Sequence, residues 1–287
     1  MIMRMINTLF IFVTLAILAG AMARLLQRYV LKETDPYAYS FLTQIISAVF
    51  FLPFALANFT LPTDPKAWVV LAGASILWTL VSLTASISYK GTEVSLRDPI
   101  AQSKLLWVLP LSILFLKEQI TVYRALGTLI IFLGVSLLIW HPERKLGRLA
   151  DKGVRWTLMA ALLAAVVTIV DKAALRWFVP EVYGFMVYFF PMMILVLFLQ
   201  RRKHHVNHLF KNRAKSALLA IMCSVLTYYF TLKAFAVADV TLAYPLLQLT
   251  TVITVFGGII MLKEREHIWQ KMIAAVLVVI GASILHL

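Results

Sequence analysis

One stretch of the chain occurs twice at a constant offset, and this duplication is the strongest constraint on the fold. Residues 93–118 align without a gap on residues 239–264. The identical pairs are Val94/Val240, Leu96/Leu242, Pro99/Pro245, Gln102/Gln248, Ile113/Ile259, Leu116/Leu262, Lys117/Lys263 and Glu118/Glu264. The chain is therefore interpreted as a tandem duplication, with a first repeat over residues 1–142 and a second over residues 143–287.

The composition indicates that both repeats lie in a lipid bilayer. The chain is 62% hydrophobic and only 14% charged, with a mean hydropathy of +0.88, whereas soluble domains are about 45–50% apolar and about 25% charged. The net charge of +14 comes from short clusters of Lys and Arg between apolar runs, which is typical of membrane flanks rather than of nucleic-acid binding. Cys223 is the only cysteine, so it cannot form a disulfide within the chain.

Apolar runs long enough to cross the bilayer follow one another through the whole sequence. A helix needs about 20 apolar residues to cross about 30 Å of hydrocarbon. Ten runs meet this length, at roughly 6–27, 37–58, 67–89, 95–116, 122–140, 154–175, 181–200, 216–237, 240–262 and 268–287. The prediction is an all-α, multi-pass integral membrane protein with ten transmembrane helices, five in each repeat.

The first run also has features of a cleavable signal peptide, namely Arg4, a short apolar core and the triplet Ala21, Met22 and Ala23. Because it corresponds to the run at 154–175 in the second repeat, we expect it to be retained as a helix.

Five helices per repeat have a geometric consequence. An odd number makes the second repeat enter the membrane from the opposite side, so the two five-helix repeats are inverted. Inverted repeats are typical of secondary transporters, which bind a small-molecule substrate at the repeat interface and work by alternating access. The alternatives are an accessory bundle that the duplication only stabilises, or a membrane enzyme.

The repeated motif is similar to that of a known family. In each repeat, a helix that opens with a proline and ends in Leu-Lys-Glu precedes a last helix with a glycine, Gly134 or Gly281. This pattern resembles the EamA-type members of the drug/metabolite transporter superfamily. The resemblance implies a ten-helix carrier of small metabolites in the cell membrane, often an exporter of amino acids, with a central cavity lined by both halves. Arg97, Asp98 and Lys104 make the fourth helix more charged than is usual in that family.

Two helices carry polar and aromatic residues along one face. Their members are Ser75, Trp78, Thr79, Ser82, Ser86 and Tyr89 in the third run, and Ser224, Thr227, Tyr228, Thr231 and Phe235 in the eighth. Ser and Thr in membrane helices also pack closely and bond to carbonyls of their own helix, which is the alternative interpretation. Because the stripe recurs in both repeats, Trp78, Ser82, Tyr89, Tyr228 and Thr231 are predicted to bind substrate.

Gln102 and Gln248 are the strongest site candidates, since an amide offers both donors and an acceptor to a polar solute. They follow Pro99 and Pro245 by one turn, and a proline leaves an unpaired carbonyl one turn earlier and kinks the helix. Tyr244 and Thr251 share the face of Gln248 and are also predicted to bind substrate. A hydrogen bond between the two glutamines is the alternative, and Gln44 is a weaker candidate.

Lys104 indicates the substrate class. A Lys deep in the bilayer costs about 2.5–3.5 kcal/mol, which suggests a use, and together with Arg97 and Arg24 it would form a cationic wall for a carboxylate such as an amino acid. Snorkelling of the side chains to the headgroups is the alternative, and the many aromatic residues would equally suit a hydrophobic cationic drug. Asp171 is interpreted as neutralised by its neighbour Lys172 rather than as a proton relay.

No enzyme motif is present. The histidine cluster of His204, His205 and His208 lies in a basic loop, where contact with phosphate headgroups is favoured over zinc. The chain has no nucleotide-binding loop, so we expect no cofactor, and uphill transport would need a coupling ion or an exchanged solute. We expect a monomer or a homodimer.

Orientation in the membrane is open to two interpretations. Most Lys and Arg fall in the loops on the side opposite both termini, which predicts that the termini are outside the cell. The family resemblance implies termini inside.

Overall fold

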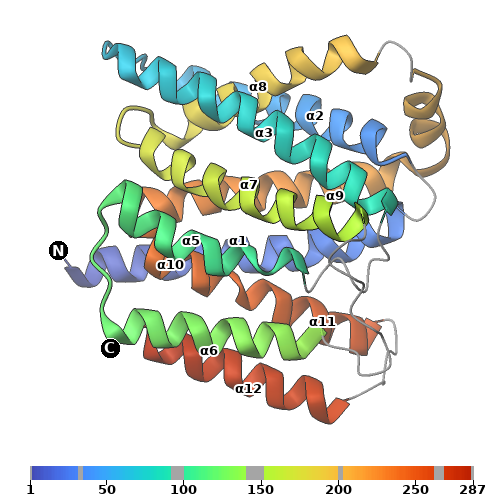
Figure 1. The fold of residues 1–287 in the computed structure, drawn as a ribbon. Coiled ribbons are helices and arrows are strands. Elements are labelled where there is room, and N and C mark those ends of the chain that lie inside the picture. The colour runs from blue at the N-terminus through green and yellow to red at the C-terminus, as the bar shows by residue number, and fades with distance from the viewer. Residues whose placement is uncertain are drawn as a thin grey trace.

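The computed structural model describes residues 2–31, 35–91, 100–139, 152–199, 203–261 and 268–285, and within these residues it contains helices and no strand. The first half forms α1 (Ile2–Leu31), α2 (Pro36–Ala57), α3 (Pro65–Gly91), α5 (Lys104–Leu111), the π-helical turn η1 (Ser112–Leu116) and α6 (Val122–Ile139). The second half forms α7 (Lys152–Ala174), α8 (Pro180–Leu199), α9 (Lys203–Val237), α10 (Val240–Leu247), α11 (Leu249–Met261) and α12 (Ile268–Ile284), as Figure 1 shows. The all-α prediction is confirmed for the described residues, while the predicted boundary at 142 lies outside them.

Many of these helices have the length and apolar surface of membrane spans. The segments Asn7–Leu31, Tyr37–Ala57, Pro65–Ala85, Lys152–Ala174 and Ala214–Val237 are each long and apolar enough to cross a bilayer. Shorter apolar helical segments cover Lys104–Leu116, Val122–Leu137, Pro180–Val196, Val240–Thr254 and Trp269–Ile284. Large apolar side chains such as Val69, Leu114 and Val276 are exposed on the outer surface, where lipid rather than water suits them. The chain is a multi-pass membrane protein.

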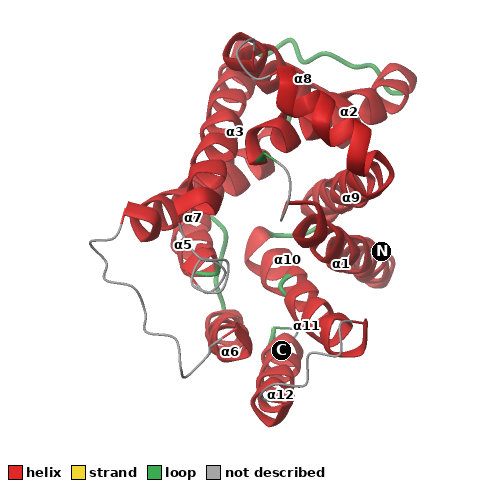
Figure 2. Ribbon diagram, turned by 90° about the vertical axis from the view of Figure 1, so that its right-hand side faces the viewer, coloured by secondary structure: helices red, strands yellow, loops and turns green. Residues whose placement is uncertain are grey.

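The helices of the two halves pack in matching pairs. α1 packs along α9, and α7, its counterpart in the second half, packs along α3. α2 pairs with α8, and α6 pairs with α12. Figure 2 shows the α6–α12 pair at one end of the molecule and α2, α3 and α8 at the other. Exchanging the halves leaves this set of contacts unchanged, as expected for a duplicated chain whose repeats are related by a two-fold axis.

The α6–α12 pair depends on glycine. A Cβ added to Gly127 would lie 2.7 Å from the carbonyl oxygen of Gly281, and one added to Gly281 would lie 2.8 Å from the carbonyl oxygen of Gly127. Small residues allow membrane helices to approach so closely that their backbones touch. Gly281, singled out in the repeated motif, is therefore a packing residue.

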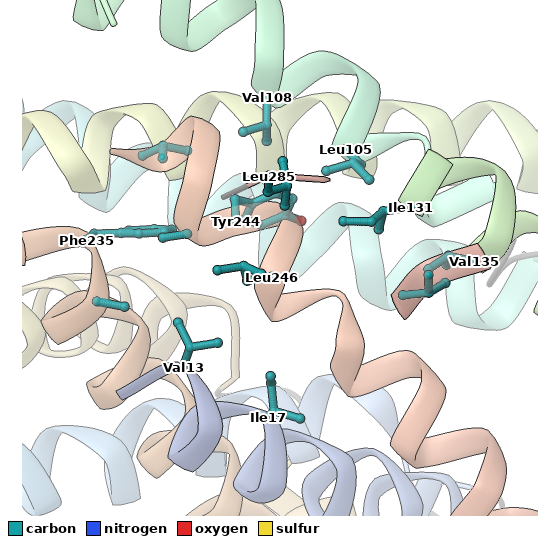
Figure 3. Close-up of a cluster of buried hydrophobic side chains, with 14 of the residues drawn as sticks. Val13, Ile17, Leu105, Val108, Ile131, Val135, Phe235, Tyr244, Leu246 and Leu285 are labelled. Atoms are coloured by element: carbon teal, nitrogen blue, oxygen red, sulfur yellow. The ribbon is translucent and has the colours of Figure 1, made fainter. Parts of the chain in front are cut away.

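A cluster of buried apolar side chains joins the halves around α10. Its members come from α1, α5, η1, α6, α7, α9, α10, α11 and α12, together with Leu285 just after α12. Figure 3 labels Val13, Ile17, Leu105, Val108, Ile131, Val135, Phe235, Tyr244, Leu246 and Leu285 of this cluster. The first half thus packs directly on the segment that carries the second copy of the proline motif.

The N- and C-terminal ends of the described chain lie at the same end of the bundle (Figure 1).

Candidate functional site

Each repeat interrupts a helix at the predicted glutamine. Gln248 lies between α10 and α11, and its backbone N–H donates to the carbonyl of Pro245 at 3.0 Å, three residues back instead of the usual four. In the first repeat, Gln102 lies just before α5, and the N–H of Leu105 donates to its carbonyl at 3.0 Å. The sequence predicted that the proline kinks the helix, and in the second repeat the bonding pattern changes three residues after Pro245, at Gln248. α10 continues past Pro245 to Leu247, although proline has no N–H to donate to the carbonyl of Thr241.

The two glutamine side chains differ in exposure and are not bonded to each other. Gln248 is 5% exposed, and Gln102 is half-buried. Within the described residues no hydrogen bond joins the two amides, so the alternative of a Gln–Gln bond does not describe this conformation. Neither the Gln102 amide nor the Gln248 amide therefore serves as the hydrogen-bond partner of the other.

Two cations bracket the interruption at Gln248. The Lys104 ammonium, from α5, lies 4.7 Å from the ring centroid of Tyr244, one turn before the glutamine. The Arg24 Nη1, from α1, donates to the hydroxyl of Thr251 at 2.8 Å, one turn after it. Both cations come from the first repeat, and both contacted residues come from the second. Four residues that the sequence singled out as site or wall residues therefore meet in pairs.

The other predicted wall and pocket residues are less informative. Arg97 and Asp98 lie outside the described residues. Gln44 is buried in α2, and its Oε1 has no hydrogen-bond partner among the described residues. Ser82 is half-buried on α3, and the side chain of Tyr89 is not described.

A second polar cluster surrounds Asp171 of α7, which is 3% exposed. Asp171 Oδ1 accepts hydrogen bonds from the Tyr183 hydroxyl at 2.6 Å and from the Trp78 indole N–H at 3.1 Å. Asp171 Oδ2 accepts from the Tyr228 hydroxyl at 3.1 Å. Trp78 comes from the first repeat, and the other three residues come from the second.

Aromatic rings enclose this carboxylate. The ring of Tyr228 packs edge-on against Trp78 at a centroid distance of 5.3 Å and against Tyr188 at 5.4 Å. Phe51 of α2 lies 6.5 Å from the same ring. The aromatic members of the two predicted stripes, Trp78 and Tyr228, are therefore brought together.

The interpretation of Asp171 as neutralised by Lys172 is wrong. The Lys172 ammonium donates to the carbonyls of Phe235 and Ala238 at the end of α9, at 2.5 and 2.8 Å. Successive residues on a helix point about 100° apart, so they do not face each other. The adjacency of Asp171 and Lys172 in one helix therefore argued against their pairing. An ionisable residue inside a membrane helix also indicates function, so the sequence did contain a signal for Asp171. No spacing rule pointed to Tyr183, because it lies on a different helix.

The hydroxyls of the stripes mostly bond within their own helices. Ser75, Thr79, Ser224, Thr227 and Thr231 each donate to the carbonyl four residues back. The packing alternative therefore describes these hydroxyls. For Thr231, whose hydroxyl donates to Thr227 at 2.8 Å, substrate binding stays a prediction.

A third polar contact joins the repeats at the end of the bundle that holds the termini. The Glu118 carboxylate accepts from the backbone N–H groups of Val240 and Thr241, both at 2.9 Å. It thus satisfies two free donors at the start of α10 and complements the helix dipole there. Arg124 Nη1 and Asp239 Oδ2 form an ion pair at 3.0 Å beside it. The residue equivalent to Glu118, Glu264, lies outside the described residues.

No group of three or more His, Cys, Asp and Glu able to hold a metal ion occurs within the described residues. The side chains of His204, His205 and His208 are not described.

Comparison with known proteins identifies the family. The sequence profile of the EamA-like transporter family matches residues 7–140 and again residues 151–287. A solved structure described as "Crystal structure of protein" aligns with a TM-score of 0.77 at 15% identity, over 97% of this chain and 96% of that one, which shows a shared fold. No curated protein matches the chain. The double match, one copy in each half, covers nearly the whole sequence, and this chain belongs to the EamA-like transporter family.

Proposed function

We propose that this protein is a secondary transporter that exports small carboxylate-bearing metabolites, such as amino acids, across the cell membrane. The observation that carries the proposal is the pair of cations on either side of the Gln248 interruption. Lys104 lies against Tyr244, and Arg24 is bonded to Thr251.

This arrangement suits a carboxylate for three physical reasons. A cation away from water is costly unless it meets an opposite charge or polar groups, and a bound carboxylate would provide that charge for Lys104. α11 begins immediately after Gln248, so the positive end of its dipole points at the same place. Interrupted helices use such ends to bind anionic groups of substrates in other transporter folds. The Gln248 amide would then add a donor and an acceptor.

Alternating access follows from the duplicated architecture. We take the described helices to form ten membrane crossings in two inverted repeats. In this count, α5 with η1 is one crossing, and α10 with α11 is another. Gln102 and Gln248 would occupy equivalent positions near the axis that relates the repeats. Rocking of one repeat against the other around these residues would expose the site to each side of the membrane in turn, driven by an ion gradient or by an exchanged solute.

A metabolite screen of cells that overproduce the protein tests this function. The wild-type protein is expected to raise extracellular amino acids or related carboxylates. Lys104→Met is expected to lower that export roughly tenfold or more, because a charged hydrogen-bond partner contributes about 1.5–3 kcal/mol. Lys66→Met, which changes an exposed lysine at the start of α3, is the matched control and should export at the parental rate.

Efflux of hydrophobic cations is the second candidate, and the aromatic rings around Asp171 favour it. Both oxygens of Asp171 already accept hydrogen bonds, which leaves the carboxylate less available to a bulky ligand. Export in the screen that is limited to lipophilic cations, or export at the parental rate by Lys104→Met, would overturn the carboxylate proposal.

A further inference from the structure

Asp171 differs from the other described acidic residues in that it is buried and its hydrogen-bond partners are all neutral. Trp78, Tyr183 and Tyr228 donate to it, and no cation forms an ion pair with it in the described part of the chain. By contrast, Glu181, the other buried acid of this region, forms an ion pair with Lys233 at 2.5 Å.

The charged and titratable groups around Asp171 are few. Among the described side chains, α3 presents the indole of Trp78, and α8 and α9 present the phenols of Tyr183, Tyr188 and Tyr228. α5 presents Lys104, which forms no ion pair with Asp171. The neighbouring Lys172 is turned toward the end of α9. The carboxylate is therefore held by dipoles and hydrogen bonds rather than by a counter-charge.

We propose that Asp171 is a reversible proton-binding site, and that the proton it binds controls the contact between the two repeats. This inference rests on the proposed transport function for its physiological meaning, because a proton bound at Asp171 would serve as a coupling ion. The proton-binding step itself can be tested without any substrate.

The geometry assigns the proton to Oδ2. Oδ1 already receives two donors, from Tyr183 and Trp78, whereas Oδ2 receives one, from Tyr228. A protonated carboxyl donates through its own O–H, and a tyrosine hydroxyl can either donate or accept. Within the cluster, a proton on Oδ2 therefore requires only that the Tyr228 hydroxyl rotate and accept.

The loss of charge then acts on the contact between repeats. Hydrogen bonds to an ionised acceptor are roughly twice as strong as those between neutral groups. The Trp78 N–H, on α3 of the first repeat, is the described bond from that repeat to Asp171. Binding a proton weakens this bond and loosens α3 from α7, while Tyr183 still holds Asp171 within the second repeat.

Infrared difference spectroscopy of the purified full chain in lipid tests the proposal. Between neutral and acidic pH, the wild-type protein is expected to gain the C=O band of a neutral carboxylic acid, and Asp171→Asn is expected to lose it. Glu181→Gln is the matched control and should keep the band. Tyr228→Phe should raise the pH at which the band is half-developed by about one unit, because removing a donor destabilises the ionised form.

Trp78 gives an independent readout. The difference in tryptophan fluorescence between the wild type and Trp78→Phe isolates the signal of this indole. It should change at the same pH as the infrared band, and it should be independent of pH in Asp171→Asn. If Asp171→Asn does not fold, Asp171→Glu should keep a carboxyl band at a shifted frequency.

An infrared spectrum that is the same in the wild type and in Asp171→Asn would overturn the proposal, since Asp171 would then be a permanently ionised link between helices. A Trp78 fluorescence signal that does not change at the pH where the infrared band develops would overturn the second part of the proposal, that the proton controls the contact between the repeats. Neither result bears on carboxylate export, and failure of the export screen would leave both measurements unaffected.

Discussion

Replacing Glu118 by Ala should destabilise the folded protein by about 2–4 kcal/mol. The substitution removes the acceptor of two backbone N–H groups, those of Val240 and Thr241, which are both 0% exposed. A buried donor left without a partner costs about 1–3 kcal/mol, and the loss of a carboxylate at the start of a helix adds about 0.3–1 kcal/mol. We expect a total in the lower part of the summed range because Glu118 itself is half-buried, so some water can reach the two donors after the substitution.

Thermal unfolding of the purified protein in detergent measures the effect. One kcal/mol shifts the midpoint of a large domain by about 2–4 °C, so Glu118→Ala should lower it by roughly 5–10 °C. The midpoint of Glu118→Gln should lie between those of the wild type and Glu118→Ala, because the amide oxygen can still accept a hydrogen bond but the negative charge is lost. Gln119→Ala, an exposed neighbour, is the control. Equal midpoints for Glu118→Ala and Gln119→Ala would refute the assignment of Glu118 as the cap of α10.

Three further predictions concern the packing of α6 on α12, the Arg24 contact and the orientation in the membrane. Gly127→Leu should lower the unfolding midpoint by several degrees because its side chain would meet the facing backbone of α12. Gly73→Leu, where a Cβ meets no atom within 4 Å, should not, and equal effects would contradict this packing. Arg24→Met should raise the KM for an exported carboxylate roughly tenfold through loss of a charged partner, and an unchanged KM would remove Arg24 from the site. From the distribution of Lys and Arg, a fusion after Leu287 should give active alkaline phosphatase and dark fluorescent protein, whereas the reverse pattern would place the termini inside the cell.

The sequence predicted best those features that the duplication expresses twice. The helix interruptions at Gln102 and Gln248 lie at equivalent positions of the duplicated sequence. Trp78 and Tyr228 were found through matching stripes on equivalent helices, and the structure brings their rings together. The spacing of polar and aromatic residues within each helix was sufficient to predict that Trp78 and Tyr228 share a polar face.

Contacts between different helices were beyond the reach of sequence periodicity. Glu118 was recognised as a residue at a helix end, but its role in capping α10 depends on how the two repeats pack. Asp171 was paired with the wrong partner because Lys172 is adjacent in sequence, while its true donors come from α3, α8 and α9. The same limit explains why Tyr183 was missed.

The central claim, that the chain carries carboxylates at a site bracketed by Lys104 and Arg24, is tested most directly by counterflow in proteoliposomes. Vesicles with the purified protein would be loaded with an unlabelled solute from the export screen, and uptake of the labelled solute would be followed. The wild type and the control Lys66→Met should show saturable counterflow, and the double variant Lys104→Met/Arg24→Met should show little above protein-free vesicles. Counterflow by the double variant at the wild-type rate, or none by the wild type for any carboxylate tested, would contradict the account.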